Sequence, residues 1–247
     1  MEMTQKDAEF LKTYDAERYK HPSVTVDMLI FTIGSNGKLR LLLIKRKYPP
    51  FEGCWAVPGG FLEVEEDNSL DEAAARELKE ETGIEGIYME QLYTFGNKGR
   101  DPRTRVISVA YIAMIPEGMV SPKAGDDAAE AEWFDVCLGK NKKPVFSQNI
   151  RLAFDHEDIV ATALDRMQGK ISYTPIAFEF LSDKNRFTIQ QLQKVHEAIL
   201  NKSLDAANFR RSFFANYVNR DMAKETGEKN KEGGHRPSMY YQYLGTV

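Results

Sequence analysis

Three carboxylates crowd the stretch RELKEETGI: Glu77, Glu80 and Glu81 follow one another at helical spacing. At about 100° per residue, Glu77 and Glu81 fall beside the apolar stripe of the predicted helix. Glu80 and Glu81 lie in its last turn, where the helix dipole disfavours negative charge. Partly buried like charges need a compensating cation, so a solvated charge run does not account for them. Oxygen ligands at i, i+3 and i+4 suit a hard divalent ion such as Mg²⁺, which commonly bridges carboxylates to phosphates.

The helix that carries these glutamates has recognisable ends. Ser69 and Glu72 form an S-x-x-E capping box at its start, and Gly83 suits a left-handed C-cap. We therefore predict a helix over residues 69–82. Arg76 precedes Glu80 by four residues, which places it to orient that carboxylate.

At these positions the sequence resembles the signature of the Nudix hydrolases, R-E-apolar-x-E-E-x-G-apolar. The matching residues are Arg76, Glu77, Leu78, Glu80, Glu81, Gly83 and Ile84, and WAVPGGF precedes them. The resemblance spans about residues 20–170. It implies an α/β fold, the Nudix α/β/α sandwich with a mixed sheet, and attack of water on a nucleoside-linked diphosphate, dependent on Mg²⁺ or Mn²⁺. It further implies that Arg76 and the three glutamates are catalytic, and that Gly60, Glu77, Glu80 and Glu81 form the metal site.

The loop before this helix departs from the family pattern. Gly60 and Glu66 fit the first interval, but nine residues separate Glu66 from Arg76 where the family has seven. Strict spacing back from Arg76 places Asn68 at the expected glutamate. The fourth carboxylate therefore stays open among Glu63, Glu65 and Glu66, with a merely solvated loop as the alternative for each.

Two further segments offer candidate substrate-binding residues. Arg100, Arg103 and Arg105 lie in GNKGRDPRTRVISVAY, and guanidinium forks suit diphosphate recognition. Taken alone, a solvated loop is the more common explanation for such arginines. In AGDDAAEAEWFDV, Asp127 and Glu130 are candidate substrate contacts, and a loop carboxylate of this kind is needed as the general base.

The ligand is suggested by resemblance alone. The fragments DPRTRVISVAY, AGDDAAEAEWF and AFDHEDI are similar to those of Nudix proteins that act on ADP-ribose and related nucleotide sugars. In the last fragment His156 could touch the ligand, although a histidine at this place more often caps the following helix.

The surrounding pattern indicates how these residues are positioned. Strands are expected at 23–33 and 39–47, as a hairpin, and within CWAVPGG, YMEQLYTFG, RVISVAYIAMIP and AEAEWFDV; a second helix is expected at 156–170. The longest apolar runs are broken by Asp27 or Ser108 and are too short to span a membrane, so no membrane partner is expected. With two cysteines and no apolar signal segment, the chain reads as a cytoplasmic protein.

The chain of 247 residues divides by charge. Residues 184–247 contain 11 Lys and Arg against 6 Asp and Glu, or +5, which leaves 22 against 31, or −9, for residues 1–183. An acidic body suits a metal site, whereas a basic module suits a polyanion. We predict an N-terminal helix within 1–20, a Nudix domain over 21–175, a linker over 176–186 and a C-terminal domain over 187–247.

That C-terminal domain reads as a small winged helix-turn-helix domain. Helices are expected in TIQQLQKVHEAIL and LDAANFRRSFFANY, followed by two strands joined by a Gly-rich basic loop. Cations suit phosphates, and Asn and Arg suit base edges. The predicted DNA-binding residues are Asn208, Arg210 and Arg211 on the second helix, and Lys229, Lys231, His235 and Arg236 on the wing. A protein-interaction or dimerisation module remains the alternative.

The same module resembles the C-terminal domain of the NAD-related and sugar-related Nudix transcriptional regulators. In that family the Nudix domain binds ADP-ribose or a sugar, and the winged helices of a homodimer hold a double-stranded DNA operator. Three hypotheses follow: a ligand-responsive regulator, an ADP-ribose pyrophosphatase with a structural tail, or a regulator that also hydrolyses its ligand.

Overall fold

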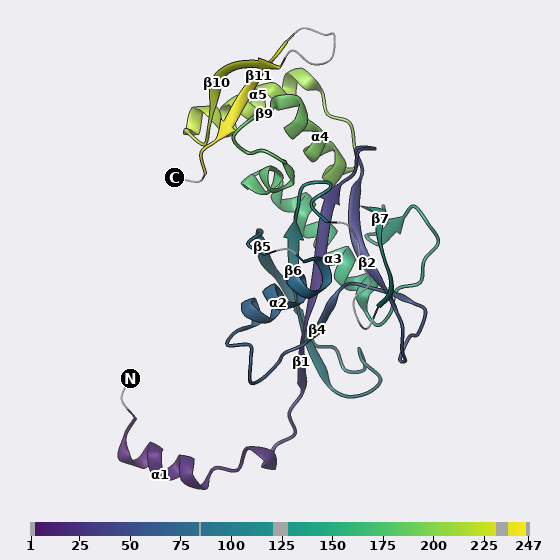
Figure 1. Ribbon diagram of the computed structural model, residues 1–247, viewed down its shortest axis with the longest axis vertical. Helices are drawn as coiled ribbons and strands as arrows, with labels where there is room; N and C mark the ends of the chain where they lie inside the picture. Colours follow the sequence, from purple (N-terminus) through teal and green to yellow (C-terminus); the bar gives the residue numbers. More distant parts are fainter. Residues whose placement is uncertain (1–2, 84, 121–127, 231–236, 246–247) are drawn as a thin grey trace.

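The structure, a computed structural model, describes residues 3–83, 85–120, 128–230 and 237–245. Figure 1 shows a sheet with helices on both sides, a smaller helical domain at the C-terminal end, and an N-terminal arm.

A mixed sheet forms the centre of the first domain. In the described part of the chain its order is β5-β6-β1-β2-β7-β8, with β3 paired to β2 and β4 paired to β1. β1 runs parallel to β6 and antiparallel to β2, which confirms the predicted hairpin and the mixed sheet. The strands are β1 (Ser23–Ile33), β2 (Leu39–Arg46), β3 (Trp55–Ala56), β4 (Gly59–Phe61), β5 (Met89–Phe95), β6 (Val106–Met114), β7 (Ala128–Leu138) and β8 (Pro144–Phe146).

Helices cover both faces of this sheet because the central strand β1 is apolar on both faces. Its alternate residues Met28 and Ile30 belong to the core under α2 (Leu70–Thr82). Leu29 and Phe31 face the opposite core, under α3 (His156–Lys170). The α/β/α sandwich is therefore confirmed, and both helices begin and end within a residue of their predicted bounds.

The C-terminal domain has the winged-helix arrangement, as predicted. It contains α4 (Ile189–Leu200), α5 (Ala206–Asn216), η3 (Val218–Arg220), and a sheet of order β10-β11-β9. β10 (Ala223–Asn230) and β11 (Ser238–Tyr243) form the wing, and the short β9 (Phe187–Thr188) is a strand that the sequence did not predict. Thr188 caps α4 through a complete capping box with Gln191.

Segment 176–186 was predicted as a linker, but its first half is part of the core. Pro175 breaks the preceding pattern and also opens the 3-10 helix η2 (Pro175–Phe180), in which Ile176, Ala177, Phe178 and Phe180 are buried. Phe178 stacks on Tyr243, with ring centroids 4.1 Å apart. One hydrophobic cluster consequently runs from the sheet of the first domain into the winged helix.

The N-terminal arm lies apart from both domains. It contains α1 (Gln5–Thr13), capped by Thr4 and Asp7, and the short η1 (Ala16–Arg18), and none of their residues is buried. Figure 1 shows the arm extending away from the start of β1. Across the described ranges, no helix has the length and apolar character needed to cross a membrane.

Candidate functional site

The helix α2 has the predicted N-cap Ser69 and C-cap Gly83, but only half of the predicted capping box forms, because the Glu72 carboxylate accepts from the Asn68 N–H and not from that of Ser69. The Ser69 hydroxyl accepts a hydrogen bond from the Glu72 backbone N–H at 3.1 Å. Gly83 adopts a left-handed conformation with φ of 73°, and its N–H donates to the Lys79 carbonyl at 2.7 Å. The glutamates are thereby held at the helix end that the dipole makes least favourable for them.

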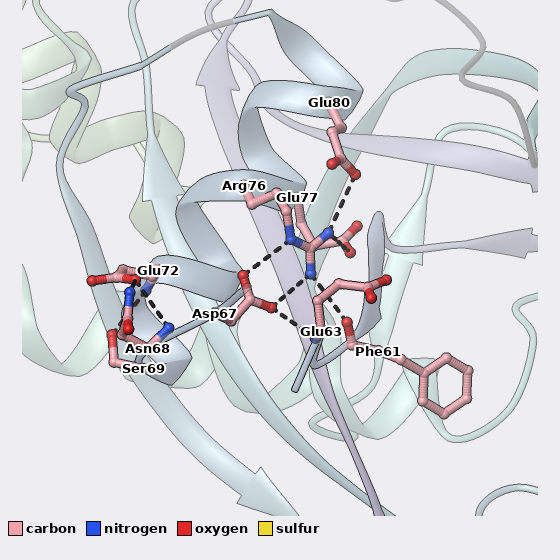
Figure 2. A network of polar contacts seen from close by, with 9 residues as sticks. All are labelled: Phe61, Glu63, Asp67, Asn68, Ser69, Glu72, Arg76, Glu77 and Glu80. Carbon is pink, nitrogen blue, oxygen red and sulfur yellow. Dashed lines mark hydrogen bonds and ion pairs between the residues drawn. The ribbon is translucent and has the colours of Figure 1, made fainter. Parts of the chain in front are cut away.

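Arg76 joins the carboxylates of this site (Figure 2). Its guanidinium donates to both carboxylate oxygens of Asp67, at 3.1 and 2.9 Å. Its Nη1 donates to Glu77 at 2.8 Å and to Glu80 at 3.3 Å, and Nη2 donates to the Phe61 carbonyl at 3.1 Å. These contacts correct the expectation that a metal alone compensates the glutamates, because Arg76 supplies part of the positive charge.

Glu77 is buried against the strand β4, which carries Gly60. Its exposed fraction is 7%, and burial raises the pKa of its carboxyl, although the Arg76 guanidinium opposes this shift. A Cβ placed on Gly60 would lie 2.1 Å from Glu77 Oε1, so the absence of a side chain at Gly60 is what lets the carboxylate occupy this place. Glu80 is more open, with 57% of its side chain exposed.

The donors present at this site fit a hard divalent ion. They are carboxylate oxygens around a backbone that carries no side chain at Gly60, which is the chemistry that Mg²⁺ and Mn²⁺ prefer. In the part of the chain that the structure describes, however, no three acidic, histidine or cysteine side chains already converge as a metal cage. The predicted ligands Gly60, Glu77, Glu80 and Glu81 all line one cleft, so the metal site stays a prediction that their chemistry supports.

The longer loop changes which acidic residues face the helix. Asn68, which strict spacing would place at the fourth carboxylate, donates from its backbone and side chain to Glu72 at 3.0 and 2.8 Å. Figure 2 shows this pair at the start of α2, away from Glu77 and Glu80. Of the three open candidates, Glu63 and Glu66 line the cleft and Glu65 is not among its lining residues.

The cleft has a volume of about 790 Å³, large enough for a nucleotide-sized ligand. Its lining includes the acidic residues Asp27, Glu63, Glu66, Glu77, Glu80, Glu81 and Asp101 together with Arg46, Phe61, Arg100, Arg103, Phe154 and His156. The structure therefore brings together the predicted helix glutamates, Arg76 and two of the three predicted arginines.

Arg100 lines the cleft but is committed to internal contacts. Only 5% of its side chain is exposed. Its guanidinium makes two hydrogen bonds to Asp155, at 3.0 and 2.8 Å, and one to Asp27 at 3.3 Å. Two carboxylates already hold this guanidinium, and the predicted substrate-binding role of Arg100 stays a prediction.

Arg103 is better placed to meet a ligand. Its guanidinium pairs with the Asp101 carboxylate, and 46% of the Arg103 side chain is exposed. The guanidinium carbon lies 5.6 Å from the ring centroid of Phe61 and 6.0 Å from that of Phe154. Arg105 is exposed and lies outside the cleft lining.

Glu130, one of the two predicted acidic substrate contacts, is not at the cleft. Glu130 lies outside its lining and pairs with Lys45 at 3.0 Å, an exposed pair on neighbouring strands. The predicted contact at Asp127 falls outside the described residues.

His156 does not cap α3, so that interpretation is wrong. It is the first residue of the helix, and its Nδ1 accepts a hydrogen bond from the Val57 N–H at 3.1 Å. Its Nε2 lies 3.9 Å from Asp27, and burial lowers the pKa of the ring. The neutral ring thus fixes the turn between β3 and β4, which leads to Gly60.

A buried polar network beneath the cleft was missed by the sequence analysis. Asp27 on β1 contacts the Ser108 hydroxyl on β6, Arg100 and His156. Asp27 and Ser108 were noticed only as breaks in two apolar runs. Because β1 and β6 are adjacent and parallel, those breaks were the signal: two polar residues in buried strands need partners.

The winged helix exposes the predicted α5 residues together. Asn208, Arg210 and Arg211 are exposed while Phe209 and Phe213 of the same helix are buried. Arg211 donates to Asn208, and Arg210 lies over the Phe214 ring at 5.1 Å.

The wing itself is only partly described. Lys229 is exposed on β10. The other predicted wing residues, Lys231, His235 and Arg236, lie outside the described ranges.

Fold and cleft together define a two-domain protein, a Nudix domain followed by a winged helix. The NUDIX domain family matches residues 23–148, and the NrtR DNA-binding winged helix domain family matches residues 177–243. The chain therefore belongs to the Nudix family and carries an NrtR-type winged helix.

Three known proteins are similar to it. The ADPR responsive transcriptional repressor NtrR of Acinetobacter baylyi is 35% identical over 95% of this chain and 87% of its own. The crystal structure of Shewanella oneidensis NrtR complexed with a 27mer DNA is 31% identical, with a TM-score of 0.72, over 89% of this chain and 93% of that chain. The ADP-ribose pyrophosphatase of Methanocaldococcus jannaschii is 42% identical over 61% of this chain and 79% of its own.

Proposed function

We propose that this protein is a transcriptional repressor that binds an operator through its winged helix and ADP-ribose in its Nudix cleft, and releases DNA when ADP-ribose binds. The observation that carries the proposal is the pairing of both modules in one chain, aligned along 95% of its length with an ADPR responsive repressor.

The chemistry of the cleft supports a nucleoside diphosphate ligand. Arg103 presents a half-exposed guanidinium, which suits a phosphate oxygen. The rings of Phe61 and Phe154 lie beside it and offer apolar faces for a base or ribose. The glutamates of α2 line the same cleft and favour a ligand whose diphosphate carries a divalent cation.

The exposed surface of α5 supports DNA binding. In a winged helix the second helix of the pair enters the major groove and the wing lies along the backbone. Asn208 and Arg210 on α5 are suited to base edges and phosphates, and Lys229 on β10 is suited to the phosphate backbone. A homodimer with two such helices would require an operator made of two half-sites, one or more helical turns apart.

A DNA-binding titration tests the regulator. The purified chain should bind duplex DNA from upstream of its own gene, and ADP-ribose should weaken that binding. Arg210→Ala should lower affinity, whereas Lys140→Ala, an exposed lysine of the Nudix domain, should leave it unchanged. Absence of salt-sensitive DNA binding by the wild-type chain would eliminate the repressor function.

A second activity, hydrolysis of ADP-ribose, is favoured by a specific observation. Arg76 and all three helix glutamates line the cleft, and a pyrophosphatase is 42% identical to the Nudix portion. Glu77, Glu80, Glu81 and the Gly60 backbone would hold Mg²⁺ or Mn²⁺. The chemistry supplied by such an ion is neutralisation of the diphosphate and a lowered pKa of bound water.

The chain's own residues have separate tasks in that reaction. Arg76 orients Glu77 and Glu80 through its two bonds from Nη1. Arg103 binds a diphosphate oxygen, and Glu63 or Glu66 accepts the proton of the attacking water, since these loop carboxylates line the cleft. The products are AMP and ribose 5-phosphate.

Product formation tests this activity. Glu80→Gln and Glu81→Gln should each reduce Mg²⁺-dependent AMP release from ADP-ribose to the level without enzyme. Glu85→Gln is a matched control, because Glu85 is exposed and pairs with Lys79 outside the cleft. Undiminished turnover in either cleft variant would overturn the assignment of the metal site.

A further inference from the structure

The helix α3 touches the ligand cleft at its first turn. Asp155, which directly precedes α3, binds the Arg100 guanidinium through two hydrogen bonds, and Arg100 lines the cleft. His156, the first residue of the helix, also lines it. A ligand that fills the cleft would lie against His156, so its binding would act directly on this end of α3.

The other end of α3 touches the DNA-binding domain. The Gln168 side-chain amide donates to the backbone carbonyl of Ile199 at 3.0 Å. Ile199 lies in the last turn of α4, where carbonyls have no partner within the helix. A side chain of the Nudix domain therefore supplies a hydrogen bond to the C-terminal end of α4 in the winged-helix domain.

Between these two contacts α3 is packed as a rigid body. Its inward face, with Ile159, Val160, Ala163 and Leu164, is buried in the core cluster. A helix of 15 residues spans about 22 Å. A close-packed face transmits displacement, so a shift at His156 is passed to Gln168.

The contact at Ile199 leads on to α5. Glu197, also in the last turn of α4, accepts a hydrogen bond from the Leu204 N–H at 2.8 Å, and Gln193 donates to the Leu204 carbonyl at 3.0 Å. Leu204 directly precedes Asp205, the N-cap of α5. A cavity of about 470 Å³ lies beside this turn and is lined by Ala198, Asn201 and residues of strands β7 and β8. It leaves room for the turn to shift.

We infer that α3 couples the cleft to the DNA-binding helix, with Gln168 as the positioning residue between the two domains. The inference rests on the proposed repressor function and adds to it the route by which ligand alters DNA binding. Gln168 touches neither ligand cleft nor DNA surface, so its replacement should separate coupling from binding.

The test measures three affinities on the full chain: ADP-ribose alone, labelled operator DNA alone, and operator DNA with saturating ADP-ribose. Gln168→Leu should keep the first two within about twofold of wild type. The factor by which ADP-ribose weakens DNA binding should fall at least about fivefold, within the usual range of coupling strengths. Gln190→Leu is the control, since Gln190 is an exposed glutamine on α4.

Hydrogen exchange gives a readout that does not depend on DNA. In wild type, ADP-ribose should change the protection of amides in 197–205, and in Gln168→Leu the change should stop at α3. An unfolded variant would be recognised by the loss of protection throughout.

The outcomes separate the two ideas. A wild-type chain whose DNA binding ignores ADP-ribose refutes the repressor proposal and this inference with it. A coupled wild type with equal coupling in Gln168→Leu refutes only the role of α3.

Discussion

Replacing Arg100 with methionine is expected to destabilise the fold by about 3–5 kcal/mol, the cost of breaking a buried ion pair. Methionine keeps most of the side-chain length and removes the charge. It leaves Asp27 and Asp155, whose side chains are 11% and 16% exposed, without the guanidinium that now bridges them. Two carboxylates would then share a desolvated site without that cation, and a buried charge without a partner is costly.

The matched comparison is Arg103→Met. Arg103 is 46% exposed at its side chain and pairs with one carboxylate, Asp101, so its loss should cost less than that of Arg100, which leaves two carboxylates without their cation. For a chain of this size, about 2–4 °C of melting temperature corresponds to each kcal/mol, so Arg100→Met should lower the midpoint by roughly 6–20 °C.

The assay is urea unfolding followed by tryptophan fluorescence, with midpoint and slope both recorded. Asp155→Asn in the Arg100→Met background provides a double-mutant cycle. Removing the charge of Asp155, which has lost its partner, should recover part of the lost free energy of unfolding. The interaction free energy between the two substitutions should be about 0.5–3 kcal/mol. The reasoning fails if Arg100→Met costs no more than Arg103→Met, or if the two changes at Arg100 and Asp155 are additive.

Three other outcomes are expected. Burial lowers the pKa of His196 to about 4. The wild-type free energy of unfolding should therefore fall by about 3 kcal/mol as the pH drops from 6.5 towards 4, because the neutral ring is favoured in the fold and the protonated ring in the unfolded chain. His196→Leu should remove this part of the pH dependence of the urea midpoint. Phe178→Ala removes a fully buried ring stacked on Tyr243 between the domains and should cost about 3–5 kcal/mol in thermal unfolding; a cost below about 1 kcal/mol would contradict this packing role. Lys229→Ala should lower the slope of log affinity for operator DNA against log salt by about 0.9 if it contacts one phosphate; an unchanged slope would remove it from the interface.

Local patterns account for the elements that the sequence predicted well. The N-cap Ser69, the left-handed Gly83 and the glutamate spacing all depend on residues within or next to one helix. The same holds for the capping box of Thr188 and Gln191 at the start of α4. Such signals act over three or four positions, so they are readable before any tertiary contact is known.

Local patterns also explain where prediction failed. The sequence predicts a linker from residue 176, directly after Pro175, because proline disrupts a helical pattern. Pro175 instead opens η2, whose apolar side chains are buried by contacts with the winged helix. Burial of this kind depends on partners elsewhere in the chain, and no nearby residue announces it.

The sequence by itself determined the acidic helix, the order of the two domains and the family to which they belong. Only the tertiary structure decided which of the predicted arginines lines the cleft with an exposed side chain. Arg100, Arg103 and Arg105 look equivalent in a loop, but Arg100 meets Asp155 and Asp27, which lie 55 and 73 positions away. Charge compensation acts through space, so residues distant in sequence decide whether a guanidinium is available to a ligand or committed to the fold.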